Sequence, residues 1–321
     1  MAVYTEVSDT DLGSFLADYG LGKLLAYKGI AEGVENSNFL LHVEAGFFIL
    51  TLYEKRVSAA DLPFFLALME HLAARGLACP QPVKTKNGAM LGMLAGRPAA
   101  IVTFLEGVSS RRPTNAQCAA LGAALGQLHR AGADFDSTRP NALSLAAWSH
   151  LFDLAKDRAD EVKAGLSSFI ADELAFLEKT WPEDLPRGVI HADLFPDNVL
   201  FLGGEVSGLI DFYFACTDFL AYDLAVCLNA WCFEPDFSFN VTKGMALIEA
   251  YQGVRKLTRE EIEALPVLAR GAALRFTLTR LVDWLNVPPG ALVKPKDPLE
   301  YVKRLRFHQR SNSARDLGLM L

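Results

Sequence analysis

The period of the hydrophobic positions changes near residue 105. Before this point, apolar residues gather in short runs of strand length, which are typical of β-strands. The residues 44–46 separate two of these runs and predict the turn of an antiparallel hairpin. Helical spacing at 9–19 precedes the strands, and helical spacing from 59 to 76 interrupts them. The strands are expected at residues 23–30, 37–43, 47–53 and 99–105, with another short strand between the turns at 87–88 and 96–98.

The rest of the chain is dominated by helical periodicity. A polar insert, residues 189–211, interrupts it. The insert reads as a short strand, a polar loop, a strand at 199–202, a Gly203-Gly204 turn and another strand at 206–210. The chain therefore predicts a β-rich lobe, 1–105, and a mainly helical lobe, 106–321, and ligands often bind in the cleft between two lobes. The helices are expected at residues 114–131, 145–165, 168–180, 219–231, 239–251, 259–284 and 298–309.

Composition excludes several classes of protein. Hydrophobic residues make up 51% of the 321 residues and charged residues 21%, which is too apolar for a disordered chain. The 31 basic and 38 acidic side chains give a net charge of −7. This charge argues against nucleic-acid binding and against a basic membrane-surface protein, because both need a positive footprint.

The sequence predicts a cytoplasmic protein. Its first residues have no basic segment followed by an apolar one, so we expect no signal peptide. The apolar runs are far shorter than the ~20 residues that a membrane span needs. The five cysteines are scattered and form no C-x-x-C pair, which favours reduced thiols over a disulfide or zinc framework. Nothing in the pattern indicates an oligomeric state.

The polar insert carries the candidate chemistry. His191, Asp193, Asn198 and Asp211 lie next to apolar strands, where unpaired carboxylates would be costly to bury. A metal ion would resolve this cost, and the oxygens of Asn198 and Asp211 suit Mg²⁺. Asp193 lies five residues before Asn198 and can accept a proton from an attacking hydroxyl.

The order of these residues resembles a kinase catalytic loop. Residues 191–198 read H-A-D-L-F-P-D-N, and 210–212 read I-D-F. The two runs are similar to the catalytic loop and metal aspartate of protein kinases, and closer to those of aminoglycoside and choline phosphotransferases. The downstream run 222–225, Y-D-L-A, resembles a further motif of that family, in which the aspartate (here Asp223) braces the loop from a helix. A match to the loop motif alone arises by chance in many chains. Here all three motifs occur in the expected order after a β-rich lobe, which favours a kinase-like site over a chance match.

Longer runs narrow the resemblance to the bacterial homoserine kinases of the aminoglycoside-phosphotransferase-like type. The similarity extends over about residues 1–315, and its most specific runs are 33–39, 50–55, 185–195, 210–215 and 223–227. The resemblance implies an α+β, two-lobed protein-kinase-like fold and transfer of phosphate from ATP to the hydroxyl of L-homoserine, a step towards threonine. It implies Asp193 as the catalytic base, Asn198 and Asp211 as Mg²⁺ ligands, and His191 as a residue that fixes the loop.

Two other functions stay open. The first is another small-molecule kinase with this fold, for an amino alcohol, a sugar or an aminoglycoside. The second is a nucleotide-binding pseudokinase, because Thr51 stands where kinases carry a phosphate-binding lysine on the third strand. Lys55 lies further along the same strand face and is the candidate replacement, although it can equally be a solvated strand end.

The resemblance places ATP phosphates under the turn between the first two strands, 29–38. Gly29 and Gly33 allow close backbone approach, and Asn36, Ser37 and Asn38 offer hydrogen-bond donors. An ordinary turn would have the same composition, so only the position in the lobe favours a phosphate site.

Adenine and the acceptor are expected at other positions. Adenine would meet main-chain groups at the hinge, from Thr103 to Leu105. Arg275 is a candidate ligand for an amino-acid carboxylate, although an arginine on such a helix is more often solvated or paired. Tyr213 is expected to border the acceptor pocket, or else to pack in the core. His129, on an apolar helix, is expected to be a core histidine.

Overall fold

A computed structural model describes the chain apart from five short segments. The described residues are 5–30, 36–54, 58–287 and 295–319. Two of the predicted nucleotide-binding residues, Gly33 and Lys55, lie outside them.

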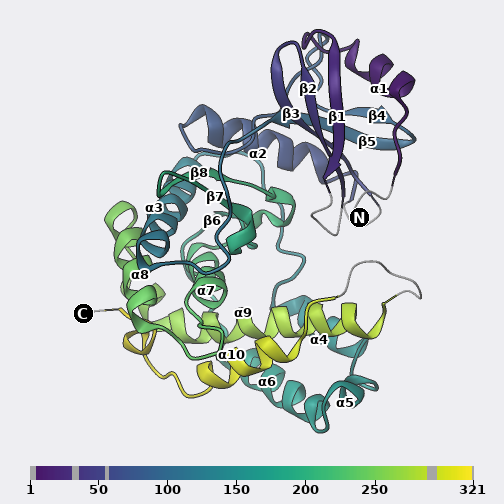
Figure 1. The fold of residues 1–321 in the computed structure, drawn as a ribbon. Helices are drawn as coiled ribbons and strands as arrows, with labels where there is room; N and C mark the ends of the chain where they lie inside the picture. Colours follow the sequence, from purple (N-terminus) through teal and green to yellow (C-terminus); the bar gives the residue numbers. More distant parts are fainter. Residues whose placement is uncertain (1–4, 31–35, 55–57, 288–294, 320–321) are drawn as a thin grey trace. The chain divides into compact units, whose positions relative to one another are not determined.

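The chain divides into two compact units (Figure 1). The first contains residues 1–107 and 207–213, and the second contains 108–206 and 214–321. The lobe boundary expected near residue 106 stays a prediction.

The first unit is built on a five-stranded antiparallel sheet with the order β1-β2-β3-β5-β4 (Figure 1). Alternation of apolar residues explains its core, because Phe39, Leu41 and Val43 of β2 are all buried on one face. The same core contains Leu12 and Leu16 of α1. The elements are α1 (Asp9–Leu16), β1 (Leu24–Ile30), β2 (Ser37–Val43), β3 (Gly46–Leu52), α2 (Leu62–Ala74), β4 (Gly92–Leu94) and β5 (Arg97–Thr103).

The predicted boundaries need two corrections in this unit. The first helix ends at Leu16, three residues before the expected end, and turns follow. The last strand begins at Arg97, so Pro98 lies inside β5 and does not break it. Proline is tolerated there because its carbonyl still accepts a hydrogen bond from the Tyr53 amide, at 2.9 Å.

The second unit is mainly helical, as predicted. Helix α3 packs along α8, and α9 packs against both α7 and α10 (Figure 1). Nearly all of α7 is buried, which agrees with its apolar sequence. The helices are α3 (Asn115–Ala131), α4 (Leu145–Asp153), α5 (Ala159–Val162), α6 (Leu166–Thr180), α7 (Leu220–Trp231), α8 (Val241–Val254), α9 (Arg259–Leu285) and α10 (Leu299–His308).

The single helix expected at 145–165 is wrong. It is two helices, α4 and α5, separated by turns at residues 154–158. Helix α5 ends at Val162 because the next residue, Lys163, has an extended backbone with a φ of −160°.

The polar insert forms short strands between the helices. Strand β6 (Arg187–Ile190) pairs antiparallel with β9 (Cys216–Phe219), and β7 (Val199–Leu202) pairs with β8 (Glu205–Leu209). The expected strands in the insert are confirmed, but β9 was not predicted from the sequence. Its alternation is hidden because Thr217 and Asp218 are polar.

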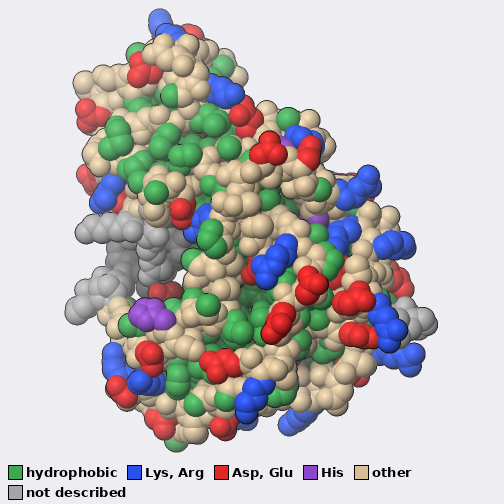
Figure 2. Space-filling view, turned by 180° about the vertical axis from the view of Figure 1, so that it is seen from behind, with side chains coloured by type: hydrophobic (Ala, Val, Ile, Leu, Met, Phe, Trp, Pro, Cys, Tyr) green, Lys and Arg blue, Asp and Glu red, His purple; other side chains and the backbone are tan. Residues whose placement is uncertain are grey.

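Charges of both signs are interspersed over the helical unit on the face in Figure 2, while hydrophobic side chains gather on part of the first unit at the top of that view. Among the described residues, the structure contains no helix that is long and apolar enough to cross a membrane.

Candidate active site

The catalytic-loop residues lie in the second unit between β6 and β7. After β6, the chain passes through residues 191–195 into a short 3-10 turn, Pro196–Asn198. Ala192 has a left-handed backbone, with a φ of 62°. This conformation costs an alanine roughly 1–2 kcal/mol, so the surrounding structure must stabilise it.

The Asp223 carboxylate, on α7, holds this strained loop. It accepts hydrogen bonds from the backbone amides of His191, at 2.7 Å, and Ala192, at 2.8 Å. Asp223 is fully buried, and burial acts to raise its pKa. The hydrogen bond and charge of His129, whose Nε2 lies 3.3 Å from Oδ2, together with His191, outweigh burial and hold the pKa of Asp223 below its usual value.

A series of hydrogen bonds between largely buried side chains connects His129 to helices α8 and α9. Its Nδ1 lies 2.8 Å from the hydroxyl of Tyr251 on α8, and that hydroxyl also accepts a hydrogen bond from Arg255, at 3.0 Å. Arg255 in turn donates to Glu261, at 2.9 Å, in the first turn of α9. His129 is therefore the satisfied core histidine that was expected, and its partners link the loop to α8 and α9.

Asp193, the expected base, has a side chain that is 19% exposed. Burial raises the pKa of Asp193, and the charges of Arg275 and His191 oppose this shift. A carboxylate in such a site is a better proton acceptor than one in water, so the group suits a base that orients an alcohol.

Asn198 is positioned by the backbone of Asp193. Its Nδ2 donates to the carbonyl oxygen of Asp193, at 2.8 Å, and lies 3.4 Å from Oδ2 of the same residue. This bond uses the nitrogen of the amide and leaves the oxygen Oδ1 for another partner. The side chain therefore fits the role of an oxygen ligand to a cation.

Arg275, the expected carboxylate ligand, is only 3% exposed. Its Nη1 donates to the carbonyl oxygen of Ala192, at 2.9 Å, and lies 3.6 Å from Oδ1 of Asp193. The three other arginines on this helix are paired with acids, Arg259 with Glu263, Arg270 with Glu173 and Arg280 with Glu300. The substrate role of Arg275 stays a prediction.

Asp211 and Tyr213 belong to the first unit. Asp211 has a left-handed φ of 66°. The Tyr213 hydroxyl lies 3.1 Å from that of Tyr53, and its ring also packs edge-on against Phe65. Desolvation raises the pKa of Tyr213 to about 12, so its hydroxyl is neutral at physiological pH. The expected Mg²⁺ role of Asp211 and the acceptor role of Tyr213 stay predictions.

The side chains expected under the ATP phosphates have partners within the first unit. Asn36 Oδ1 accepts from the Glu54 amide, at 3.3 Å, and the Ser37 hydroxyl donates to Glu54 Oε1, at 2.8 Å. Asn38 Oδ1 accepts from Thr51 Oγ1, at 2.8 Å, across β2 and β3. Thr51 thus occupies the strand position of the missing lysine and is hydrogen-bonded there.

The remaining residues that were predicted to bind the nucleotide lie at or near strand ends. Gly29 is in β1, opposite Phe39. Thr103 ends β5 and its hydroxyl accepts a hydrogen bond from the Gln81 amide, at 2.9 Å, while Leu105 follows outside the strand. The nucleotide roles of Gly29, Thr103 and Leu105 stay predictions, as do those of Asn36, Ser37 and Asn38.

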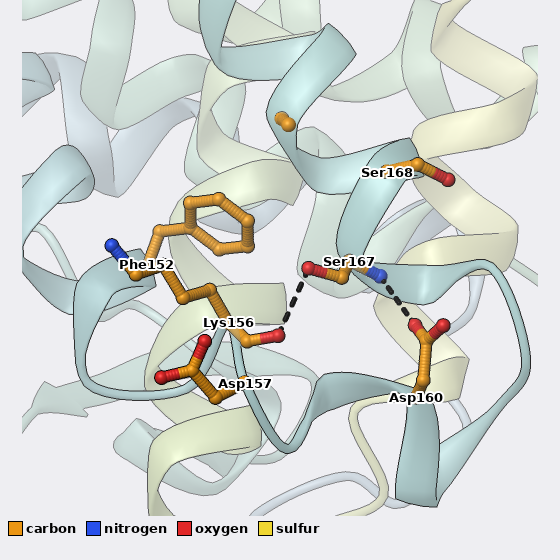
Figure 3. A pocket seen from close by; sticks show the side chains of 7 residues that line it. Phe152, Lys156, Asp157, Asp160, Ser167 and Ser168 are labelled. Carbon is orange, nitrogen blue, oxygen red and sulfur yellow. Dashed lines mark hydrogen bonds between the residues drawn. The ribbon is translucent and has the colours of Figure 1, made fainter.

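A separate hollow of about 440 Å³ lies on α4, α5 and α6 (Figure 3). Its lining includes Lys156 and Asp160, and Asp160 caps α6 by accepting a hydrogen bond from the Ser167 amide, at 2.9 Å. None of the predicted site residues lines this hollow, so it is not a candidate for the phosphoryl-transfer site.

The family comparison covers most of the chain. Residues 26–257 match the phosphotransferase enzyme family. The chain is 68% identical over 318 residues to a homoserine kinase from Methylobacterium nodulans, covering 99% of both chains. It is 67% identical over 318 residues to a homoserine kinase from Methylobacterium sp. (strain 4-46), again covering 99% of both.

The fold comparison agrees with the expected architecture. An amicoumacin kinase solved with AMP-PNP, Ca²⁺ and Ami has a TM-score of 0.71 to this chain at 13% identity, and the match covers 95% of this chain and 94% of that one. The predicted α+β fold of the kinase-like type is confirmed.

Proposed function

Because this chain belongs to the homoserine kinases of the phosphotransferase enzyme family, we propose that it transfers the γ-phosphoryl group of ATP to the hydroxyl of L-homoserine. The product would be O-phospho-L-homoserine, which leads towards threonine.

One observation carries the proposed mechanism. The loop with Asp193 is fixed through the Asp223 carboxylate, which binds two successive backbone amides of that loop. A fixed carboxylate can accept a hydrogen bond from the attacking hydroxyl and hold its oxygen in line with the phosphorus. In this proposal Asp193 takes the proton as the oxygen–phosphorus bond forms, and ADP leaves with the electron pair of the broken bond.

We assign the nucleotide to the first unit's turn and hinge. Gly29 and Gly33 would bring backbone amides close to the phosphates, and Thr103 to Leu105 would meet adenine through main-chain groups. The donors Asn36, Ser37 and Asn38 already have partners, so their backbone amides are better suited to phosphate than their side chains. Lys55 is the proposed replacement for the strand lysine.

We assign Mg²⁺ to Asn198 and Asp211. When bound, Mg²⁺ would neutralise charge on the phosphate oxygens. The Oδ1 of Asn198 supports this assignment, since the hydrogen bonds of this side chain to other described residues use its Nδ2. Mg²⁺ commonly takes one or two protein oxygens and completes its shell with phosphates and waters, so it needs no larger protein cage.

The acceptor end and the compartment are also proposals. Tyr213 would border the homoserine pocket, for which the sequence also favoured Arg275 as the carboxylate ligand. A cytoplasmic location is supported by the cysteines, since all five are free and buried, as expected in a reducing compartment.

A coupled ADP-release assay tests the function. We expect turnover with L-homoserine, with a product heavier by one phosphoryl group, and much slower turnover with choline, methylthioribose and kanamycin. Faster turnover with one of the other acceptors would assign a different small-molecule kinase. Nucleotide binding without turnover on any acceptor would identify a pseudokinase.

Removal of divalent metal tests the Mg²⁺ proposal. We expect chelation by EDTA to abolish turnover and added MgCl₂ to restore it, because the phosphate charge is then no longer neutralised. Asp211→Asn should raise the MgCl₂ concentration for half-maximal rate by about tenfold or more, because it removes one anionic ligand. Asp236→Asn, on an exposed loop of the second unit, is the matched control. An unchanged Mg²⁺ dependence in Asp211→Asn would contradict the assignment.

A further inference from the structure

Arg275 reaches the catalytic loop from a distant part of the sequence. It lies in the second half of α9, and its Nη1 donates to the carbonyl oxygen of Ala192, 83 residues earlier. The same nitrogen lies 3.6 Å from Oδ1 of Asp193. One guanidinium group therefore contacts both the strained peptide and the carboxylate that follows it.

The guanidinium is held in place by aromatic rings. Its central carbon lies 4.0 Å from the centroid of the Phe276 ring and 5.4 Å from that of Phe214. A planar cation stacked on aromatic faces loses little freedom when it forms a hydrogen bond. Arg275 is thus fixed before any ligand binds.

The Ala192 residue is held from both sides. Its amide donates to Asp223, and its carbonyl accepts from Arg275, both in the buried interior. Two charged partners of opposite sign therefore bind the donor and the acceptor of the same residue. A left-handed alanine is stable only when its surroundings fix it, and these two bonds supply that restraint.

We infer that Arg275 is a positioning residue for phosphoryl transfer: by holding the Ala192 carbonyl and the Asp193 carboxylate together, it fixes the direction in which Asp193 meets the acceptor hydroxyl. This inference rests on the proposed function. It gives Arg275 a role different from the carboxylate ligand expected from the sequence.

The position in the loop supports the inference. Protein kinases carry an arginine between the histidine and the aspartate of this loop, whereas this chain has Ala192 there. The guanidinium at this loop comes instead from α9. A group that is 3% exposed and already bonded to the backbone is better suited to orient the loop than to capture a substrate.

Steady-state kinetics of Arg275→Met separate the two roles. We expect kcat to fall by about 10–100-fold, because a small displacement of a reacting group has effects of this size, while KM for homoserine stays within about threefold. Arg275→Lys should recover part of the lost kcat, since it can still donate to the Ala192 carbonyl. Arg280→Met is the matched control on the same helix, because Arg280 pairs with Glu300 and not with the loop.

A second substitution tests the link through the strained residue. Glycine adopts a left-handed backbone without strain. Ala192→Gly combined with Arg275→Met should therefore regain part of the kcat that Arg275→Met loses. Should Arg275→Met lose its melting transition, Arg275→Gln replaces it in both measurements.

The outcomes are distinct. Wild-type turnover on homoserine decides the proposed function first, and the variants are then measured with whichever acceptor the wild type phosphorylates. A raised KM with unchanged kcat would assign Arg275 to the substrate and overturn the inference. An unchanged kcat and KM would overturn it as well.

Discussion

Asp193→Asn should lower kcat by about 10²–10⁴-fold, which is the usual contribution of a general base. The amide has nearly the size of the carboxylate but cannot accept the proton of the acceptor hydroxyl. We expect the fold to survive, because Asn198 bonds mainly to the backbone carbonyl of residue 193, which the substitution keeps. Burial raises the pKa of Asp193, so a neutral side chain should also be tolerated there.

The measurement is the rate of phospho-homoserine formation, together with the melting temperature. Asp197→Asn is the matched control, since Asp197 is four residues further along, its side chain is 66% exposed, and its Oδ2 lies 3.7 Å from Nζ of Lys296. We expect this control to keep a near-normal rate. Turnover of Asp193→Asn above roughly a tenth of the wild-type rate would remove Asp193 from the role of base.

Asp223→Ala should have the largest effect on stability. The substitution leaves two buried amides, those of His191 and Ala192, without their acceptor, and it leaves His129 facing a cavity. Loss of one partner from a buried charged network costs roughly 3–5 kcal/mol, so the melting temperature of the second unit should fall sharply. The catalytic rate should fall with it, because the left-handed backbone of Ala192 loses its main restraint.

Thermal unfolding and the homoserine assay, both below the new melting temperature, check this prediction. Asp223→Asn is the more conservative variant: it keeps one acceptor oxygen but turns an N–H₂ group towards a backbone N–H. Asp236→Ala is the control, because Asp236 is exposed and accepts its hydrogen bonds from the nearby Ser238, so its removal should leave the melting temperature close to that of the wild type. Equal melting temperatures for Asp223→Ala and the control would refute the proposal that Asp223 stabilises the catalytic loop.

Much of the fold follows from local pattern. Strand β2 was predicted to the residue, because its apolar residues Phe39, Leu41 and Val43 lie two residues apart and a turn begins directly after Val43. Helix α9 begins at the predicted residue, Arg259, where Thr258 caps it and Glu261 completes a capping box, and it ends one residue after the predicted end. The helix predicted at 145–165 failed because hydrophobic spacing does not reveal the break between α4 and α5.

Local sequence patterns likewise predicted some residues of the candidate site and missed the contacts of others. Asp193, Asn198 and Asp223 were found because each lies in a short motif with fixed spacing. The contacts of His129 and Arg275 were missed, because their partners lie 94 and 83 residues away. No periodic signal records such contacts, which depend on how α3, α7 and α9 pack. A histidine and an arginine on otherwise apolar helix faces are the only local hints that the sequence offers.

Helix α9 is connected to the catalytic loop by two series of hydrogen bonds, which begin at different residues of the helix and end at the same residue of the loop. Arg275 binds the Ala192 carbonyl directly, while Glu261, roughly 21 Å earlier along the helix axis, reaches the Ala192 amide through Arg255, Tyr251, His129 and Asp223. The helix itself connects the starting points of these two series of hydrogen bonds. The stiffness of the loop is therefore set by a helix of 27 residues rather than by the loop's own short sequence, and a distortion at the first turn of α9 has a continuous bonded path to the reacting carboxylate.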